Sequence, residues 1–227
     1  MKISIVIPVL NEAPLVIQNL PALQPFRVAG HELILVDGGS DDATVPLSEP
    51  FVDQTIRSSK GRSRQMNNGA IAAKGEILLF LHIDTLLPEG ADHLIMNGMK
   101  REMRSWGRFD VRLSGRHPFF RVVAWLMNWR SRITGIATGD QAIFVQKKLF
   151  RTVGGFPEID LMEDIALCKR LKGYSPPCCL WQRVIISSRR WEKNGMVRTI
   201  LLMWFLRGAY FFKVNPNRLA KFYDRTK

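Results

Sequence analysis

The run from Ile77 to Leu81 constrains the fold most. Five consecutive apolar residues are too many for a strand with one solvated face and too few for a typical helix, so they predict a strand buried on both faces. His82 and Asp84 follow, and strand alternation would turn both side chains to one side at the carboxyl end, where open α/β sheets bind ligands. The two could hold a divalent metal. Taken alone, they also fit a turn before Pro88 and a core histidine.

Apolar runs and helical segments alternate through the first half of the chain. The pattern predicts strands at 3–7, 32–37 and 54–56, with helices at 15–23, just before residue 50, and at 61–73. This order favours a parallel sheet with crossover helices. The second half predicts strands at 107–113, 141–145 and 183–188, helices at 147–153 and 163–171, and a loop at 176–180. We see no repeat or linker, and expect one domain over 1–191 with an amphipathic helical tail over 192–227.

The charge balance indicates the kind of partner that the protein binds, and the cysteines indicate its redox compartment. Thirty-three Lys and Arg against twenty Asp and Glu give +13, which favours an anionic partner such as nucleic acid, phospholipid or a phosphorylated substrate. Cys168, Cys178 and Cys179 suit neither a disulfide framework nor a zinc site, so a reducing cytoplasm fits best. Met1 and Lys2 lead directly into a short strand, and we expect no secretory signal.

Two stretches, 117–133 and 196–214, mix large aromatic residues with arginines. The second is nearly long enough to span a bilayer, but Arg198, Arg207 and Lys213 interrupt it, which makes it a poor spanning helix. Aromatic bulk with basic flanks suits an interfacial helix on anionic lipid. The alternative is that both stretches are helices packed against the domain or against a second subunit of a homo-oligomer.

Four motifs occur in order: IVIPVLNE at 5–12, VDGGSDDAT at 36–44, GRSRQMNNGA at 61–70 and HIDT at 82–85. Together they resemble the family 2 glycosyltransferases of the inverting GT-A type, over roughly the first 170 residues. The chain is also similar to a small subgroup with a G-R-x-x-Q-M-N-x-G-A helix and a late R-R-W. The resemblance implies a GT-A, Rossmann-like, mostly parallel sheet flanked by helices, with a basic amphipathic C-terminal tail.

The resemblance implies transfer of a sugar, with inversion, from a nucleotide-sugar donor, UDP-linked by expectation, to an acceptor that the basic aromatic stretches suggest is lipid-linked. Asp37 can accept hydrogen bonds from a base or ribose, and an arginine can donate two parallel bonds to phosphate. Turns and solvated surface charges remain the alternatives for these residues. The implied nucleotide-binding residues are Pro8, Asn11, Glu12, Asp37, Arg62, Arg64 and Asp84.

The implied cofactor is a divalent metal, Mn²⁺ or Mg²⁺, bound by Asp84 and His82. Asp84 matches the last acid of the family's D-x-D motif, whereas His82 stands where the family commonly has Asp. There are two alternatives for this departure. With one carboxylate fewer the metal affinity would be lower, or His82 would ligate and shift the preference from magnesium toward manganese, because imidazole is the softer ligand. The metal neutralises charge that develops on the departing nucleoside diphosphate.

The resemblance places the catalytic base in an E-D pair at the start of a late helix, here Asp164, since inverting transfer needs a group that removes the acceptor's proton. Acids in a first helical turn also complement the helix dipole, which is the alternative. Asp140 is expected to face the acceptor or to form a turn. Arg190 and Trp191 would cover the phosphates or stack on a sugar, unless Trp191 only packs the tail.

Other classes of protein stay open or are excluded. A nicotinamide enzyme is excluded because the first strand is not followed by G-x-G-x-x-G. A nucleotidyltransferase of similar fold and a noncatalytic membrane-surface adaptor remain alternatives. We expect a cytoplasmic protein, peripheral at the inner membrane face if its tail binds lipid, with no nucleic-acid partner. Asp37, Asp84 and Asp164 should then converge on one cleft.

Overall fold

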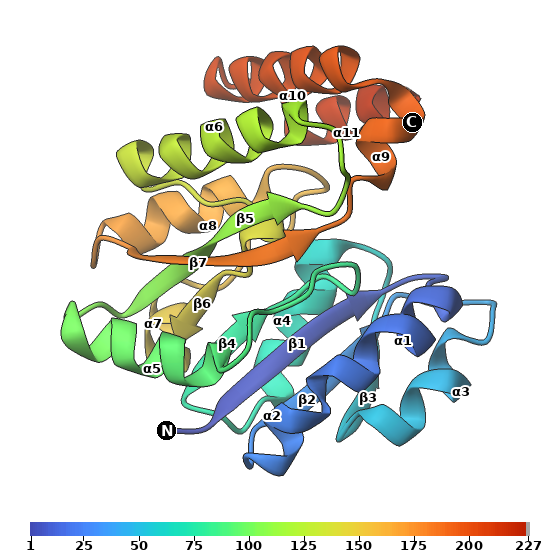
Figure 1. The fold of residues 1–227 in the computed structure, drawn as a ribbon, viewed down its shortest axis with the longest axis vertical. Helices are drawn as coiled ribbons and strands as arrows, with labels where there is room; N and C mark the ends of the chain where they lie inside the picture. Colours follow the sequence, from blue (N-terminus) through green and yellow to red (C-terminus); the bar gives the residue numbers. More distant parts are fainter. Residues whose placement is uncertain (226–227) are drawn as a thin grey trace.

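Seven strands form one sheet in the order β3-β2-β1-β4-β6-β5-β7 (Figure 1). The computed structural model describes residues 1–225, without the side chains of residues 190, 193, 194, 197, 224 and 225. The strands are β1 (Ile3–Val9), β2 (Glu32–Asp37), β3 (Gln54–Arg57), β4 (Ile77–Phe80), β5 (Trp106–Leu113), β6 (Phe144–Gln146) and β7 (Cys178–Ile186).

The predicted parallel sheet is confirmed, and its central strand is β4. Strands β3, β2, β1 and β4 pair in parallel, with Ile5 opposite both Leu33 and Leu79. Strand β6 is antiparallel to β4 and to β5, whereas β7 again runs parallel to β5. The carboxyl ends of β1, β2 and β4 therefore share one edge of the sheet. This edge is where the polar residues that follow these strands were expected to meet.

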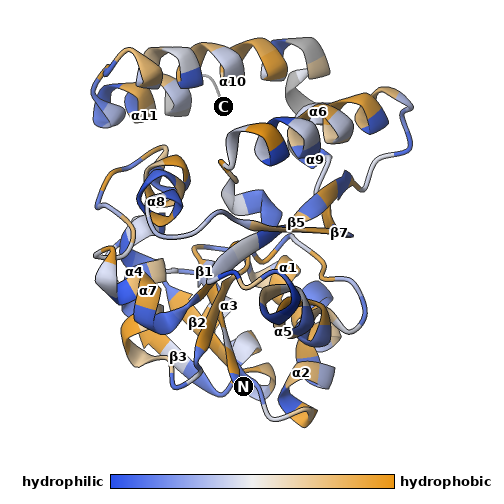
Figure 2. Cartoon of the chain, turned by 90° about the vertical axis from the view of Figure 1, so that its left-hand side faces the viewer, coloured by the Kyte–Doolittle hydropathy of each residue, from blue (hydrophilic) through white to orange (hydrophobic). Residues whose placement is uncertain are grey.

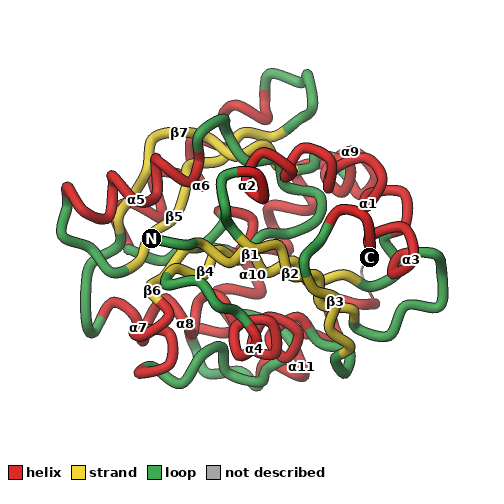
Figure 3. Tube along the Cα trace, turned by 90° about the horizontal axis from the view of Figure 1, so that it is seen from below, coloured by secondary structure: helices red, strands yellow, loops and turns green. Residues whose placement is uncertain are grey.

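Helices cover both faces of the sheet, which is why the strands are continuously apolar. The helices are α1 (Ala13–Asn19), α2 (Gln24–Val28), α3 (Thr44–Ser48), α4 (Arg62–Ala72), α5 (Ala91–Arg101), α6 (Phe119–Thr134), α7 (Lys147–Thr152), α8 (Glu163–Lys172), α9 (Arg189–Asn194), α10 (Met196–Phe211) and α11 (Pro216–Arg225), with 3-10 turns at Leu20–Leu23, Glu49–Phe51 and Gly139–Gln141. Ile5 and Ile7 pack with α1, α5 and α6, and Val6 with α4, α7 and α8. Figure 3 shows helices on the two sides of the sheet.

Several local predictions differ from the structure. The strand expected at 141–145 begins at Phe144, after a 3-10 turn at Gly139–Gln141, and the strand expected at 183–188 ends at Ile186. Residues 176–180 are only partly a loop, because β7 begins at Cys178, where it pairs in parallel with Gly107 of β5. Helix α5 was not predicted; its sequence contains Gly98, which lies close to Leu180. Strand β4 ends at Phe80, one residue earlier than expected. Among the described residues, no helix has both the length and the apolar character needed to cross a bilayer.

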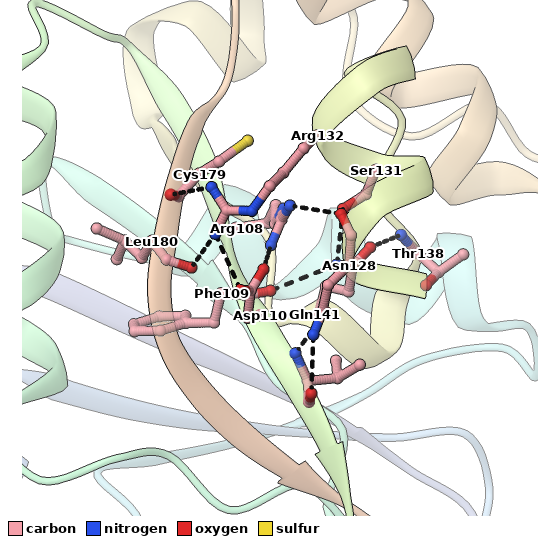
Figure 4. A network of polar contacts seen from close by, with 11 residues as sticks. Arg108, Phe109, Asp110, Asn128, Ser131, Arg132, Thr138, Gln141, Cys179 and Leu180 are labelled. Atoms are coloured by element: carbon pink, nitrogen blue, oxygen red, sulfur yellow. Dashed lines mark hydrogen bonds and ion pairs between the residues drawn. The ribbon is translucent and has the colours of Figure 1, made fainter. Parts of the chain in front are cut away.

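A buried polar network attaches α6 to the sheet (Figure 4). Asp110 on β5 accepts from the buried Arg108 and, at 2.9 Å, from Arg132 of α6. Asn128 of α6 pairs with the backbone of Val111, donating at 3.1 Å and accepting at 2.8 Å. The Arg132 guanidinium also lies 3.4 Å from the centre of the Trp181 ring. Two arginines thus share one buried carboxylate, and neither is left without a counter-charge.

Replacing Asp110 with Asn should destabilise the protein strongly, because both arginines would lose the charge that balances them in the interior. Breaking a buried ion pair in this way costs about 3–5 kcal/mol. Urea denaturation measures the change, with Glu158→Gln as the control, since Glu158 forms an exposed pair with Arg64. The control should shift the free energy of unfolding by less than about 0.5 kcal/mol. Equal effects of the two substitutions would contradict the role given to Asp110.

Candidate active site

A cavity of about 580 Å³ lies at the carboxyl ends of β1 and β4, within the size range of small-molecule sites. Helices α8, α10 and α11 also contribute to its wall. The predicted site residues that line the cavity are Pro8, Glu12, Arg62, His82, Asp84, Asp140, Asp164 and Trp191. Residues that were predicted from three of the four motifs and from the late helix are thus brought together.

Three of the predicted residues lie outside the cavity wall. Asp37 is buried and accepts hydrogen bonds from the backbone of Gly39 at 3.1 Å and from the hydroxyl of Ser40 at 2.5 Å. Asn11 accepts from the backbone of Asp41 at 3.0 Å, and Arg64 pairs with Glu158. Asp37 therefore does not converge with Asp84 and Asp164, and it shapes its own loop. The side chain of Arg190 lies outside the described residues.

The amide residues of the GRSRQMNNGA motif hold helix α4 in place. Gln65 donates to the carbonyl oxygens of Val9 and Val36, each at 2.8 Å, and so joins the ends of β1 and β2. Asn67 exchanges two hydrogen bonds with the backbone of Phe156, at 2.9 and 3.0 Å. These contacts fix the start of α4, where Arg62 lines the cavity.

Gly69 lets α4 lie directly on the sheet. A Cβ at this position would meet Val6 Cγ1 at 2.4 Å and Val36 Cγ2 at 2.9 Å, closer than side chains can pack. Most residues described here from the GRSRQMNNGA motif therefore hold α4 against the rest of the protein, and Arg62 is the residue of the motif that lines the cavity.

His82 and Asp84 reach the cavity from a turn. Ile83 and Asp84 follow the end of β4, and the Thr85 N–H donates to the His82 carbonyl at 3.0 Å. The prediction that strand alternation aligns the two side chains was wrong, although both line the same cavity. His82 Nδ1 lies 3.3 Å from Asp140 Oδ1, and a Cβ at residue 139 would stand 2.7 Å from the imidazole, which explains the glycine there.

Asp164 occupies the first turn of α8, and its carboxylate is held in a defined orientation. Oδ2 accepts from the N–H of Gly139 at 2.9 Å, and Oδ1 accepts from the N–H of Ile165 at 2.7 Å. The preceding Met162 has a left-handed backbone, with φ of 69°, which starts the helix sharply. Since a carboxylate offers about four acceptor positions, Asp164 can still accept a proton from a ligand in the cavity.

The carboxyl groups of the cavity differ in the direction in which their surroundings shift their pKa. Burial, followed by the charge of Asp84, raises the pKa of Glu12. Burial also raises the pKa of Asp140, but the hydrogen bond with His82 and nearby positive charges outweigh it and leave that pKa below its usual value. Burial and the charge of Asp164 raise the pKa of Glu163 to about 7. Pairs of acids whose pKa values are pushed apart are typical of catalytic sites, although buried ion networks show them too.

Several wall residues were not predicted. Arg189 lines the cavity, although the R-R-W motif had drawn attention to Arg190 and Trp191. Arg207 of α10 and Tyr223 of α11 line it as well, from the predicted tail. A sequence signal existed for Arg207, because an arginine in the middle of an apolar helix needs an explanation.

Asp84 and His82 suit a metal ion that takes its other ligands from the substrate. Among the residues that the structure describes, no three His, Cys, Asp or Glu side chains converge as a protein-only metal site requires. Asp84 faces the cavity, and His82 Nε2 is buried without a hydrogen-bond partner in the described part of the chain. This donor set suits Mn²⁺ or Mg²⁺ ions that take their other ligands from phosphate oxygens and water.

The family profile described as "Glycosyl transferase family 2" matches residues 4–150. The chain therefore belongs to glycosyl transferase family 2. No curated protein sequence matches it significantly.

Solved structures of glycosyltransferases share the fold. TarS 1-349 of S. aureus in complex with UDP superposes with a TM-score of 0.69 at 17% identity, over 82% of this chain and 60% of that one. The mannosyltransferase PcManGT from Pyrobaculum calidifontis, in complex with GDP-Man and Mn²⁺, gives 0.60 at 20% identity, over 81% and 56% of the two chains. Glucosyl-3-phosphoglycerate synthase from Mycobacterium tuberculosis, in complex with Mn²⁺, UDP and glucosyl-3-phosphoglycerate, gives 0.60 at 16% identity, over 82% and 70%. The chain thus spans less than two thirds of the length of the TarS and PcManGT chains.

Glu163 should make stability depend on pH. In the folded protein the Glu163 carboxyl has a pKa of about 7 and keeps its proton up to about that pH. In the unfolded chain the same carboxyl has its usual pKa of 4.5. The stabilisation is therefore complete below pH 4.5 and is lost as pH rises through 7. Relative to Glu163→Gln, the wild-type melting temperature should fall between pH 5 and pH 8, by about 2–4 °C for each kcal/mol lost. Glu158→Gln is the control, and parallel wild-type and Glu163→Gln curves would contradict the prediction.

Proposed function

We propose that the protein transfers a sugar from a nucleotide donor, UDP-linked, to an acceptor hydroxyl with inversion. The observation that carries this proposal is the convergence of Asp84, His82 and Asp164 on one cavity at the carboxyl edge of the sheet. A group that holds a donor diphosphate and a group that removes a proton are the two parts that single-step sugar transfer requires.

The donor belongs at the β1 and β4 side of the cavity. Pro8 and Glu12 would contact the nucleoside. The guanidinium groups of Arg62 and Arg189 would donate hydrogen bonds to the diphosphate. Asp84 and His82 would hold Mn²⁺ or Mg²⁺, which supplies charge neutralisation at the leaving diphosphate. Asp37, the last residue of β2, keeps the loop at 38–40 in position at this edge of the sheet.

Asp164 is the proposed general base. It takes the proton of the acceptor hydroxyl while the hydroxyl oxygen attacks the anomeric carbon from the side opposite the diphosphate. The bond between that carbon and the phosphate oxygen breaks, and the nucleoside diphosphate leaves with the electron pair. One displacement inverts the configuration, and the Arg62 and Arg189 charges favour the more negative leaving group.

The structural neighbours support a nucleotide-sugar donor. TarS has been solved with UDP and with UDP-GlcNAc, and glucosyl-3-phosphoglycerate synthase with UDP and Mn²⁺ or Mg²⁺. PcManGT carries GDP-Man, so a guanosine donor belongs in the same assay.

Replacing Asp164 with Asn should lower turnover by about 10²–10⁴-fold, because the amide cannot take up the acceptor proton. Turnover is measured as nucleoside diphosphate release from a panel of UDP- and GDP-sugars. Calorimetry with UDP and Mn²⁺ should give an unchanged Kd. Asp160→Asn is the control, because Asp160 is an exposed acid in the loop just before α8. Retained turnover in Asp164→Asn, or loss of UDP binding, would remove the base assignment.

We also propose that the protein docks on an anionic membrane through an apolar face, defined by the exposed side chains of Val122, Trp125, Leu126, Trp129, Ile133, Leu201, Trp204, Phe205, Phe211, Phe212 and Phe222. Figure 2 shows α6, α10 and α11 together at one end of the molecule. Exposed arginines and lysines accompany them, among them Arg121, Arg198 and Lys221. Tryptophan with basic neighbours is typical of helices at a lipid surface. A lipid-linked acceptor would reach the site from there.

Trp204→Ser should weaken binding to phosphatidylserine vesicles, because it removes an exposed aromatic anchor from the apolar face. Cosedimentation with vesicles measures the bound fraction, and binding should fall further as salt screens the basic residues. Tyr174→Ser is the control, since Tyr174 is 64% exposed but lies outside the apolar face. Equal loss in both variants, or no binding by the wild type, would contradict the membrane proposal.

A further inference from the structure

Arg207 lies in the most apolar helix of the chain, and it lines the cavity. Helix α10 reads MVRTILLMWFLRGAYF, in which Arg198 and Arg207 are the charged residues. Leu206, next to Arg207, is fully buried and packs with Met162 and Ile165 at the start of α8. The helix is therefore anchored beside the catalytic acids, and its second arginine faces the cavity.

No protein group in the described part of the chain forms a hydrogen bond or ion pair with the Arg207 guanidinium. Burial lowers its pKa, and the charges of Asp164 and Asp140 act against that effect. A partly buried arginine is normally paired, because an uncompensated charge away from water is costly. The site therefore leaves a charged donor group available to a ligand.

A further positive charge near Arg207 is that of Arg130 on α6. Its Nη1 donates to the Ile136 carbonyl at 3.1 Å, whereas Nε and Nη2 are buried without described partners. Burial and the charge of Arg207 lower the pKa of Arg130 to about 10. The positive charges of Arg130 and Arg207 thus repel each other, and both are attracted by the negative charge of Asp164.

The arginines of the cavity interact with different acids. Arg189 acts on Glu12, and Glu12 lies with Asp84 at the proposed donor side. Arg207 instead acts on Asp140 and Asp164, at the side where the acceptor hydroxyl must lose its proton. Arg62 interacts with Glu12 and with Asp140. Since Leu206 packs with Met162 and Ile165, on either side of Asp164 in the chain, an anion at Arg207 would lie on the side of the proposed base and would belong to the acceptor.

We propose that Arg207 forms an anion subsite for the acceptor, so that the acceptor carries a phosphate or carboxylate group near the hydroxyl that receives the sugar. The inference rests on the proposed function and names the class of acceptor for the same site. A planar guanidinium can bind such a group through two parallel hydrogen bonds, which would also orient the hydroxyl toward Asp164.

The test compares two probes that differ by one phosphate group, glycerol 3-phosphate and glycerol, by calorimetry with and without saturating UDP and Mn²⁺. Wild-type protein should bind glycerol 3-phosphate and not glycerol, in both conditions. Arg207→Met should weaken this binding by about ten- to a hundredfold, the value of a charge-assisted hydrogen bond. Arg207→Lys should recover part of it, and the Kd for UDP should not change.

Arg198→Met is the matched control, because Arg198 lies on the same helix but is exposed. Its affinity for glycerol 3-phosphate should stay within about twofold of wild type, a difference below about 0.5 kcal/mol. The inference is overturned if Arg207→Met retains the anion, if UDP displaces it, or if wild-type protein does not bind it. Absence of UDP binding would instead contradict the proposed function, and the titration without UDP would still test Arg207.

Discussion

The crowding of acids at one edge of the sheet is the constraint on which the rest of the structure depends. Glu12, Asp84, Asp140, Glu163 and Asp164 share one partly buried cavity, where burial and neighbouring negative charges raise the pKa of Glu12 and of Glu163. Guanidinium groups from α4, α9 and α10 offset that repulsion. A bound metal and a nucleotide would change the same balance, so binding and stability are linked at this edge.

This balance explains why the C-terminal helices lie beside the acids of the cavity. Leu206 of α10 and Leu219 of α11 pack on Met162 and Ile165, around the start of α8. Residues from both sides of the expected boundary at 191/192 therefore line one cavity, and Arg207 comes from the far side of it. The opposite side of the same helices exposes aromatic residues, so a single element serves both the cavity and the proposed membrane contact.

The sequence predicted the sheet and half of the site because buried strands and their polar ends leave local signals. The succession of strands and helices along the chain and the central place of β4 followed from such signals, whereas the choice of Asp164 followed from the resemblance to the family. Helix α5 was missed because its pattern includes Gly98, which is there for close packing against Leu180. The start of β7 was missed because two prolines precede Cys178. Which side of the apolar α10 faces inward depends on tertiary packing, so the role of Arg207 could not be read from periodicity.

A crystal structure of the protein with UDP and Mn²⁺ tests the central claim most directly. We expect the diphosphate beside Asp84 and His82, with its terminal phosphate oriented toward Asp164 and with Arg207 free of contact with the nucleotide. A nucleotide bound outside this cavity, or a diphosphate that contacts neither Asp84 nor His82, would contradict the account.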